Sequence, residues 1–129
     1  MPEPTYRHLK SGMDQGVLVL TLNIPELHGD QMADELREEL LDATTGAQKV
    51  VLDFQPMGFM SSVGFRPLLS LRRKLLEAGG QLVFCNLGPA ILDVLHTTRM
   101  ISTSRSSVAP FDAEPDVPSA VARLNAAQK

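Results

Sequence analysis

The sequence has little cysteine and few aromatic residues. Among its 129 residues Cys85 is the only cysteine, Trp is absent, and there are one Tyr and five Phe. A single cysteine excludes a disulfide scaffold and is compatible with a reducing compartment. So few aromatic side chains would make it hard to build stacking platforms for single-stranded nucleic acid.

The chain also lacks a basic excess and long apolar runs. Its formal net charge is −3, with a pI near 5.5, which argues against a dedicated nucleic-acid binder. No window of eighteen apolar residues occurs, and the start, MPEPTYRHLKSG, has no apolar signal core. We therefore expect a cytoplasmic protein that neither binds nucleic acid nor inserts into a membrane.

What the chain does contain is typical of a globular domain. Hydrophobic residues make up 43% and charged residues 21%, and the length suggests one domain over residues 1–129. Apolar, strand-like runs alternate with amphipathic, helix-like segments after a starting hairpin. The prediction is an α/β fold: a mixed, largely parallel sheet of four or five strands with about four helices packed on it.

The predicted elements follow from apolar runs and from Gly and Pro positions. The hairpin comprises a short exposed strand at 5–11, a turn at 12–16 and a buried strand at Val17–Leu22. Further strands are expected at 49–54, Gln81–Cys85 and 108–111. Helices are expected from an N-cap at Asp30 to a stop at Gly46, from Ser61-Ser62 to Gly79-Gly80, from Pro89 to about His96, and near 119–126.

Helical spacing also predicts which side chains face the core. Met32, Leu36, Leu40 and Ala43 form the apolar stripe of the first helix. The second helix is expected to bury five residues, and those are Phe65, Leu68, Leu69, Leu75 and Leu76.

Metal and catalytic sites find little support. The candidate metal ligands His8, His28, His96 and Cys85 are widely spaced, without a His-x-x-x-His or Cys-x-x-Cys pair. His96 fits a helix C-terminus, and Cys85 fits a small buried apolar position. No phosphate-binding glycine motif appears, so we expect no cofactor and no enzyme.

Asp53 has two interpretations because it follows an apolar strand. At the carboxyl end of such a strand it could contribute to a ligand site. The preferred interpretation is that its carboxylate accepts hydrogen bonds from the following loop.

The pair Ser61-Ser62 also has two interpretations, because it lies where a loop leads into a helix. A serine there is first of all a helix cap. It is alternatively a phosphorylation site, since a phosphate adds about −1.5 to −2 charges next to helix N–H groups that favour an anion.

Four motifs in one order, strongest between residues 49 and 100, resemble the STAS domain family, named for sulphate transporters and anti-sigma-factor antagonists. They are KVVLDF, FMSSVGF, PLLSLRRKLLEAGG and QLVFCNLGPAILDVLHTTRM. The hairpin and LNIPELHGDQMADELREEL resemble the first half of the family more loosely. Bacterial anti-sigma-factor antagonists usually show a strand ending in Asp, then Phe-(Met/Ile)-Asp-Ser-Ser-Gly-Leu, then a helix ending in Gly-Gly.

The departures from that motif fall at its phosphorylation switch. Aligning Gly64 with the motif glycine puts Ser61 in place of Asp and Ser62 at the first motif serine. Val63 then takes the second serine, which is the usual phosphoacceptor of sporulation-type antagonists. Either Ser62 or Ser61 has become the acceptor, or this is a STAS domain without phosphoregulation, and Ser62 is the better candidate because it alone aligns with a motif serine.

The resemblance implies a regulatory protein that binds an anti-sigma factor, typically a serine kinase. The alternative is a STAS subunit that docks on a transporter ATPase or a stress-signalling complex without phosphoregulation, and a homodimer stays open in either case. The partner-binding surface is expected at Ser61, Ser62, Val63 and Gly64 and on the exposed side of the next helix at Arg66.

Overall fold

The computed structural model describes residues 6–97 and 111–126, and it confirms the predicted α/β class. Five strands form one mixed sheet in the order β1-β2-β4-β6-β7, and two short strands, β3 and β5, form a second sheet. The strands are β1 (Leu9–Asp14), β2 (Val17–Leu22), β3 (Glu26–Leu27), β4 (Lys49–Asp53), β5 (Phe59–Met60), β6 (Gln81–Cys85) and β7 (Asp112–Glu114). The helices are α1 (Asp30–Ala43), α2 (Phe65–Glu77), α3 (Pro89–Thr97) and α4 (Val117–Ala126), and a 3-10 turn, η1 (Ser62–Gly64), precedes α2.

The N-terminal hairpin closes more tightly than predicted. Asp14 pairs with Val17, so only Gln15 and Gly16 form the turn, both with positive φ (53° and 82°). Positive φ at both positions is the backbone of a type I′ turn, whose twist matches that of the two strands it joins. The predicted turn at 12–16 was therefore too long, and Gly12 lies inside β1.

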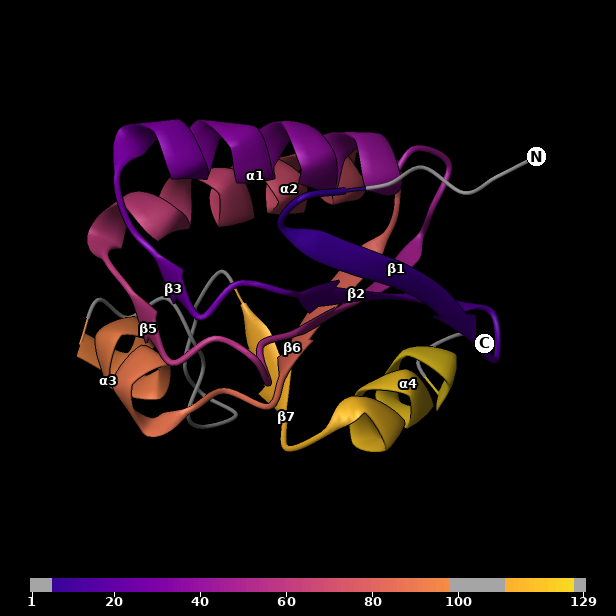
Figure 1. Ribbon diagram of the computed structural model, residues 1–129. Coiled ribbons are helices and arrows are strands. Elements are labelled where there is room, and N and C mark those ends of the chain that lie inside the picture. Colours follow the sequence, from indigo (N-terminus) through magenta and orange to yellow (C-terminus); the bar gives the residue numbers. More distant parts are fainter. Residues whose placement is uncertain (1–5, 98–110, 127–129) are drawn as a thin grey trace.

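Helices cover both faces of the main sheet (Figure 1). Antiparallel β1 and β2 start the sheet, and β2, β4, β6 and β7 then run parallel, because each connection between them contains a helix. Helices α1 and α2 lie side by side on one face, and α4 packs on the other against β2, β4 and β6.

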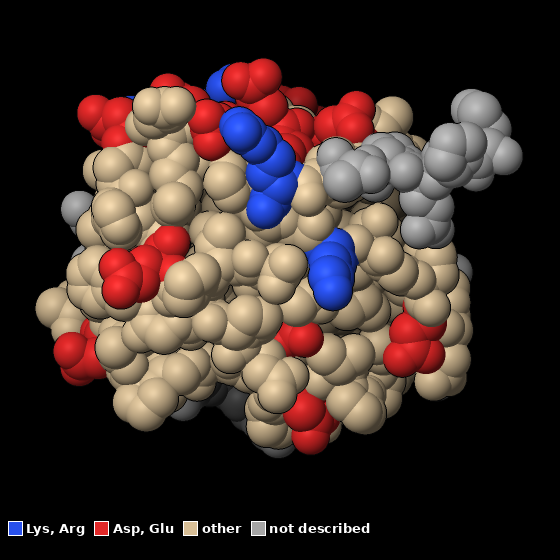
Figure 2. All heavy atoms as spheres, in the orientation of Figure 1, with Lys and Arg blue, Asp and Glu red and all other residues tan. Residues whose placement is uncertain are grey.

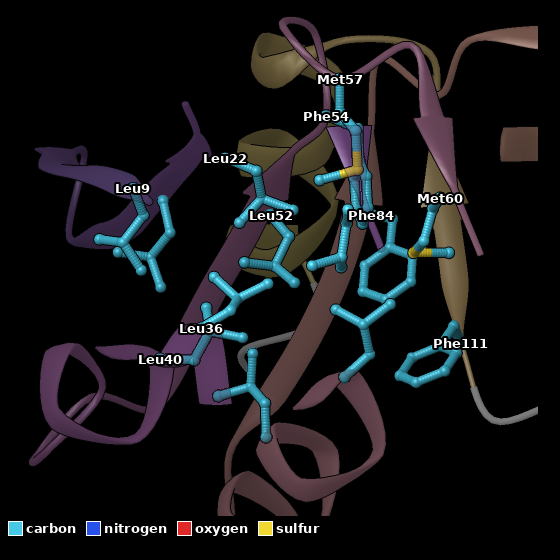
Figure 3. Close-up of a cluster of buried hydrophobic side chains, with 14 of the residues drawn as sticks. Leu9, Leu22, Leu36, Leu40, Leu52, Phe54, Met57, Met60, Phe84 and Phe111 are labelled. Carbon is cyan, nitrogen blue, oxygen red and sulfur yellow. The ribbon is translucent and has the colours of Figure 1, made fainter. Parts of the chain in front are cut away.

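The larger core lies between the sheet and helices α1 and α2. Leu20, Leu52 and Phe84 come from three neighbouring strands, and Leu36 and Leu68 come from the two helices; all are fully buried. Figure 3 shows this layer continuing to Phe54, Met60 and Phe111. Successive residues on a strand face opposite sides, so Val51 and Cys85 point instead to the smaller core beneath α4.

Two predictions about the helices were wrong, one strand prediction is largely untested, and one small sheet was not foreseen. Asp30 is the first residue of α1, and the N-cap is Gly29, whose φ of 83° suits glycine. Leu69 and Leu76 lie outside the buried stripe of α2 and are 37% and 55% exposed, because spacing of three and four residues buries Leu68, Leu71 and Leu75 instead. The predicted strand at 108–111 falls mostly outside the described residues, and the described strand is β7. The small β3–β5 sheet was not predicted.

Candidate functional site

The segment predicted to bind a partner is a short turn between β5 and α2. Strand β5 pairs with β3, and the Ser61 N–H continues that pairing by donating to the Leu27 carbonyl at 2.9 Å. The Gly64 N–H then donates to the Ser61 carbonyl at 3.0 Å, which closes η1 just before Phe65 starts α2. Backbone hydrogen bonds therefore fix both ends of the turn.

Gly64 lets this turn lie directly on the core. A Cβ atom at Gly64 would come within 2.5 Å of Met60 Cγ, 2.7 Å of Met60 Sδ and 2.8 Å of Leu27 Cδ2. These distances are shorter than Cβ contacts in folded proteins, so any side chain at position 64 would force the buried Met60 and Leu27 side chains to shift. Gly64 is also the N-cap of α2, with no side-chain cap, so the prediction that a serine caps this helix was wrong.

The side chains of this turn differ in accessibility. Val63 is partly buried, and the Ser61 Oγ atom is fully buried without a hydrogen-bond partner among the described residues. A buried hydroxyl left without a partner loses its hydrogen bonds to water and destabilises the fold. A kinase could not reach the Ser61 hydroxyl in this conformation.

Arg66, in the first turn of α2, reaches across to α1. Its guanidinium Nη2 lies 2.9 Å from Asp30 Oδ1 and 3.8 Å from Asp34 Oδ1, and its side chain is 54% exposed. The ion pair joins the N-terminal ends of the two helices. The sequence placed Arg66 on the exposed side of α2 but gave no signal for these partners, which lie more than thirty residues away.

The two helices next to the turn carry opposite charges. Six of the fourteen residues of α1 are Asp or Glu, whereas four of the thirteen residues of α2 are Arg or Lys. Figure 2 shows acidic side chains gathered along the top of the molecule, where α1 lies. The candidate surface therefore lies where an acidic and a basic helix meet.

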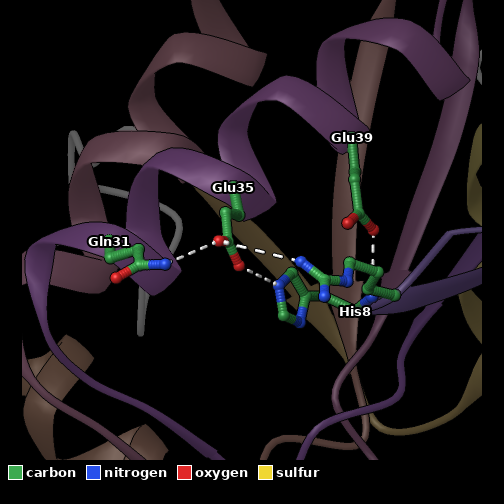
Figure 4. A network of polar contacts seen from close by, with 5 residues as sticks. His8, Gln31, Glu35 and Glu39 are labelled. Atoms are coloured by element: carbon green, nitrogen blue, oxygen red, sulfur yellow. Dashed lines mark hydrogen bonds and ion pairs between the residues drawn. The ribbon is translucent and has the colours of Figure 1, made fainter.

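A second polar network ties the segment before β1 to α1 (Figure 4). The His8 Nε2 lies 2.9 Å from Glu35 Oε1, and the His8 backbone N–H donates to Glu39 Oε1 at 2.9 Å. Hydrogen bonds from His8 and then from Gln31 lower the pKa of Glu35 below its usual value. In the opposite direction, burial and the hydrogen bond to Asp42 raise the pKa of Tyr6 to about 12. This network was not predicted.

The other sequence candidates have structural roles. Asp53 Oδ1 accepts hydrogen bonds from the Gln55 N–H at 3.0 Å and from Asn86 Nδ2 at 2.9 Å, so the preferred interpretation, that it holds the following loop, is confirmed. Cys85 is fully buried, and burial, followed by the nearby Asp53 and Asp116 carboxylates, raises its pKa to about 12. His96 lies in the last turn of α3, as predicted.

Within the described residues, no group of three or more His, Cys, Asp or Glu is arranged to hold a metal ion. In that same part of the chain, none of the helices combines the length and the apolar character needed to span a membrane.

Comparison with known proteins identifies the family. Residues 13–109 match the STAS domain. The chain belongs to the STAS domain family. That match includes strands β2 to β6, helices α1 to α3 and the candidate turn, and it confirms the resemblance seen in the four sequence motifs.

Individual relatives are similar along most of their length. BtrV of Bordetella bronchiseptica, named as an anti-sigma factor antagonist, is 29% identical over 98 residues, which are 73% of this chain and 82% of BtrV. A Thermotoga maritima structure described as an anti-sigma factor antagonist superposes with a TM-score of 0.71 at 12% identity, over 91% of this chain and 94% of the other. The anti-sigma factor antagonist SpoIIAA, in its unphosphorylated form, gives a TM-score of 0.62 at 18% identity over 91% and 97%. The two structures establish the STAS fold.

Proposed function

We propose that this single STAS domain is an anti-sigma-factor antagonist, which binds an anti-sigma factor of the serine kinase class in the cytoplasm. Family membership and the similarity to BtrV support this function. The observation that carries the proposal is the turn at 61–64, which backbone hydrogen bonds and Gly64 hold in a fixed position at the surface next to Arg66. The domain binds a protein and catalyses no reaction itself.

The partner-binding surface in this proposal consists of Ser61, Ser62, Val63, Gly64 and Arg66, of which Gly64 is buried and positions the others. The core beneath the turn positions Gly64, and α1 positions Arg66 through Asp30. A fixed surface loses little conformational entropy when a partner binds, which favours affinity. The exposed Arg66 guanidinium offers a charged hydrogen-bond donor at the edge of that surface.

Ser62 is the proposed phosphoacceptor. The Ser61 hydroxyl is buried, and position 63 is a valine, so neither competes as an acceptor. Ser62 belongs to the turn η1 that precedes α2, and a phosphate there would add about two negative charges to that turn. The phosphate would change both the shape and the charge of the binding surface.

Incubation with the kinase encoded nearest to this gene, followed by phosphopeptide mapping, tests the acceptor. The expected result is one modified peptide that contains Ser62 and that is lost in Ser62→Ala but kept in the control Ser70→Ala. A modification that persists in Ser62→Ala would disprove the assignment.

Binding tests the alternative function. If the kinase binds the protein tightly but modifies no residue, the surface acts without phosphoregulation, as in a docking subunit of a stress-signalling complex. If that kinase and every other anti-sigma factor of the same cell fail to bind the purified protein, the proposed function is wrong.

A further inference from the structure

Strand β1 forms one edge of the main sheet. It pairs along its six residues with β2, and within residues 6–97 and 111–126 no strand pairs with its outer side (Figure 1). An unpaired edge presents a row of N–H and C=O groups that can hydrogen-bond another strand. This edge is separate from the turn at 61–64, so a contact along it does not depend on the proposed function.

The hydrogen bonds of the hairpin show which groups point outward. The Asn23 N–H donates to the His8 carbonyl at 2.9 Å, so His8 faces β2. Because antiparallel strands alternate residue by residue, Lys10, Gly12 and Asp14 also direct their backbone groups toward β2. The backbone groups of Leu9, Ser11 and Met13 therefore point to the open edge.

The charges of β1 are self-complementary. Lys10 and Asp14 lie on the same face of the strand, two residues on either side of Gly12. If two copies of β1 pair antiparallel about Gly12, Lys10 of each copy lies opposite Asp14 of the other. Ser11 lies opposite Met13, so the outward backbone groups of both strands meet in register. Opposite charges directly across two strands stabilise their pairing.

The space around the edge permits this arrangement. Nothing lies within 4 Å of a Cβ built on Gly12, and paired Cα atoms approach to about 4.5 Å at such non-hydrogen-bonded positions. Met13 is 69% exposed, more than any other large hydrophobic residue among those described. In the paired state the two Met13 side chains lie diagonally across from one another, which removes apolar surface from water.

We propose that a second copy of this chain binds β1 along this edge, so that two five-stranded sheets join into one. The opposite edge is less suitable because β7 has only three residues, and its Asp112 and Glu114 both pair with Arg123. The pairing leaves the surface around Arg66 available for the regulatory partner.

Sedimentation velocity on the full chain tests this pairing through charge reversal. The expected result for the unaltered protein is a concentration-dependent dimer. Lys10→Asp places two carboxylates on β1, and Asp14→Lys places two ammonium groups there, so each variant alone should dissociate about tenfold or more readily because like charges face each other. Mixed in equal amounts, the two variants should form a heterodimer, because every facing pair is then opposite in charge.

Arg37→Asp and Glu38→Lys on the exposed side of α1 are the matched controls for net charge, and they should leave the dimer unchanged. In the unaltered protein, amide exchange of Ser11 and Met13 should slow as concentration rises. A protein that stays monomeric at all concentrations, or a dimer that both β1 variants leave unchanged, would overturn the proposal.

Discussion

The two faces of the main sheet are packed in different ways although the same strands supply both. The face under α1 and α2 is filled with large side chains, including Phe54, Phe84 and Leu52. The face under α4 is filled mainly with small ones, such as Val51, Cys85 and Ala120. Successive residues of each strand point to opposite faces, and the larger side chains point to the face under α1 and α2. The layer between sheet and helices is therefore thicker beneath those two helices than beneath α4.

The candidate turn belongs to the thick side. Gly64 rests against Met60 and Leu27, which are both part of the larger core. Arg66 adds a link to α1, which covers the same face. Changes in the larger core should therefore affect the partner-binding surface, whereas changes beneath α4 should leave it in place.

Substitutions at neighbouring residues of β4 should show the largest difference between the two faces. Leu52→Ala should lower the free energy of unfolding by about 2–5 kcal/mol, because it leaves a cavity in the larger core. Val51→Ala removes two methyl groups beneath α4, with an expected loss of about 1.6 kcal/mol. Urea denaturation measures both, and an equal or larger loss in Val51→Ala would contradict the distinction between the faces.

Gly64→Ala should have the next largest effect, because its Cβ overlaps Met60 and Leu27. Overpacking of this kind costs about 1–3 kcal/mol. Gly12→Ala is the matched control, since nothing lies within 4 Å of its Cβ. Thermal and urea denaturation of the two variants give the comparison. Equal stability in both would show that Gly64 does not need to be glycine for the turn to pack on the core.

Ser61→Ala should be neutral or stabilising by about 1 kcal/mol. The substitution removes a buried hydroxyl for which no partner occurs among the described residues, and it keeps the backbone bond to Leu27. Urea denaturation gives the change in unfolding free energy. A loss of more than about 1 kcal/mol would mean that this hydroxyl does make a hydrogen bond.

Acid should weaken the link between His8 and α1. The pKa of Glu35 is lowered by folding, so its contribution is complete above its usual value of 4.5 and is lost as the pH falls through the lower folded pKa. The expected result is that Glu35→Gln reduces the fall in melting temperature between pH 5 and pH 3, whereas Glu38→Gln, on the exposed side of α1, does not. Identical acid profiles of Glu35→Gln and the unaltered protein would contradict this role.

The sequence predicted most of the sheet, because continuous apolar runs mark β2, β4 and β6. It missed β3 and β5, since two-residue strands are too short to show a periodic pattern. It extended the hairpin turn to Gly12 because a glycine inside a strand and a glycine in a turn look alike in sequence.

The sequence predicted where the candidate site lies along the chain, but it did not predict which distant residues contact it. The motif resemblance pointed to Ser61, Ser62, Val63, Gly64 and Arg66, and the first four do share one turn that runs into the helix carrying the fifth. The backbone hydrogen bond of Ser61 and the ion pair of Arg66 depend on Leu27, Asp30 and Asp34. Those residues are distant in sequence, so only the folded chain brings them to the site.

Binding of the anti-sigma factor by two charge-reversed variants of α2 tests the proposed surface most directly. Arg66→Glu reverses the charge next to the turn, whereas Arg73→Glu makes the same change two turns farther along the exposed side of the helix. The Arg66 ion pair is half exposed, so its loss should cost no more than about 1 kcal/mol of stability. By calorimetric titration, Arg66→Glu should weaken binding at least about tenfold and Arg73→Glu should not. Equal affinity of the two variants would contradict the proposal that the partner binds at this turn.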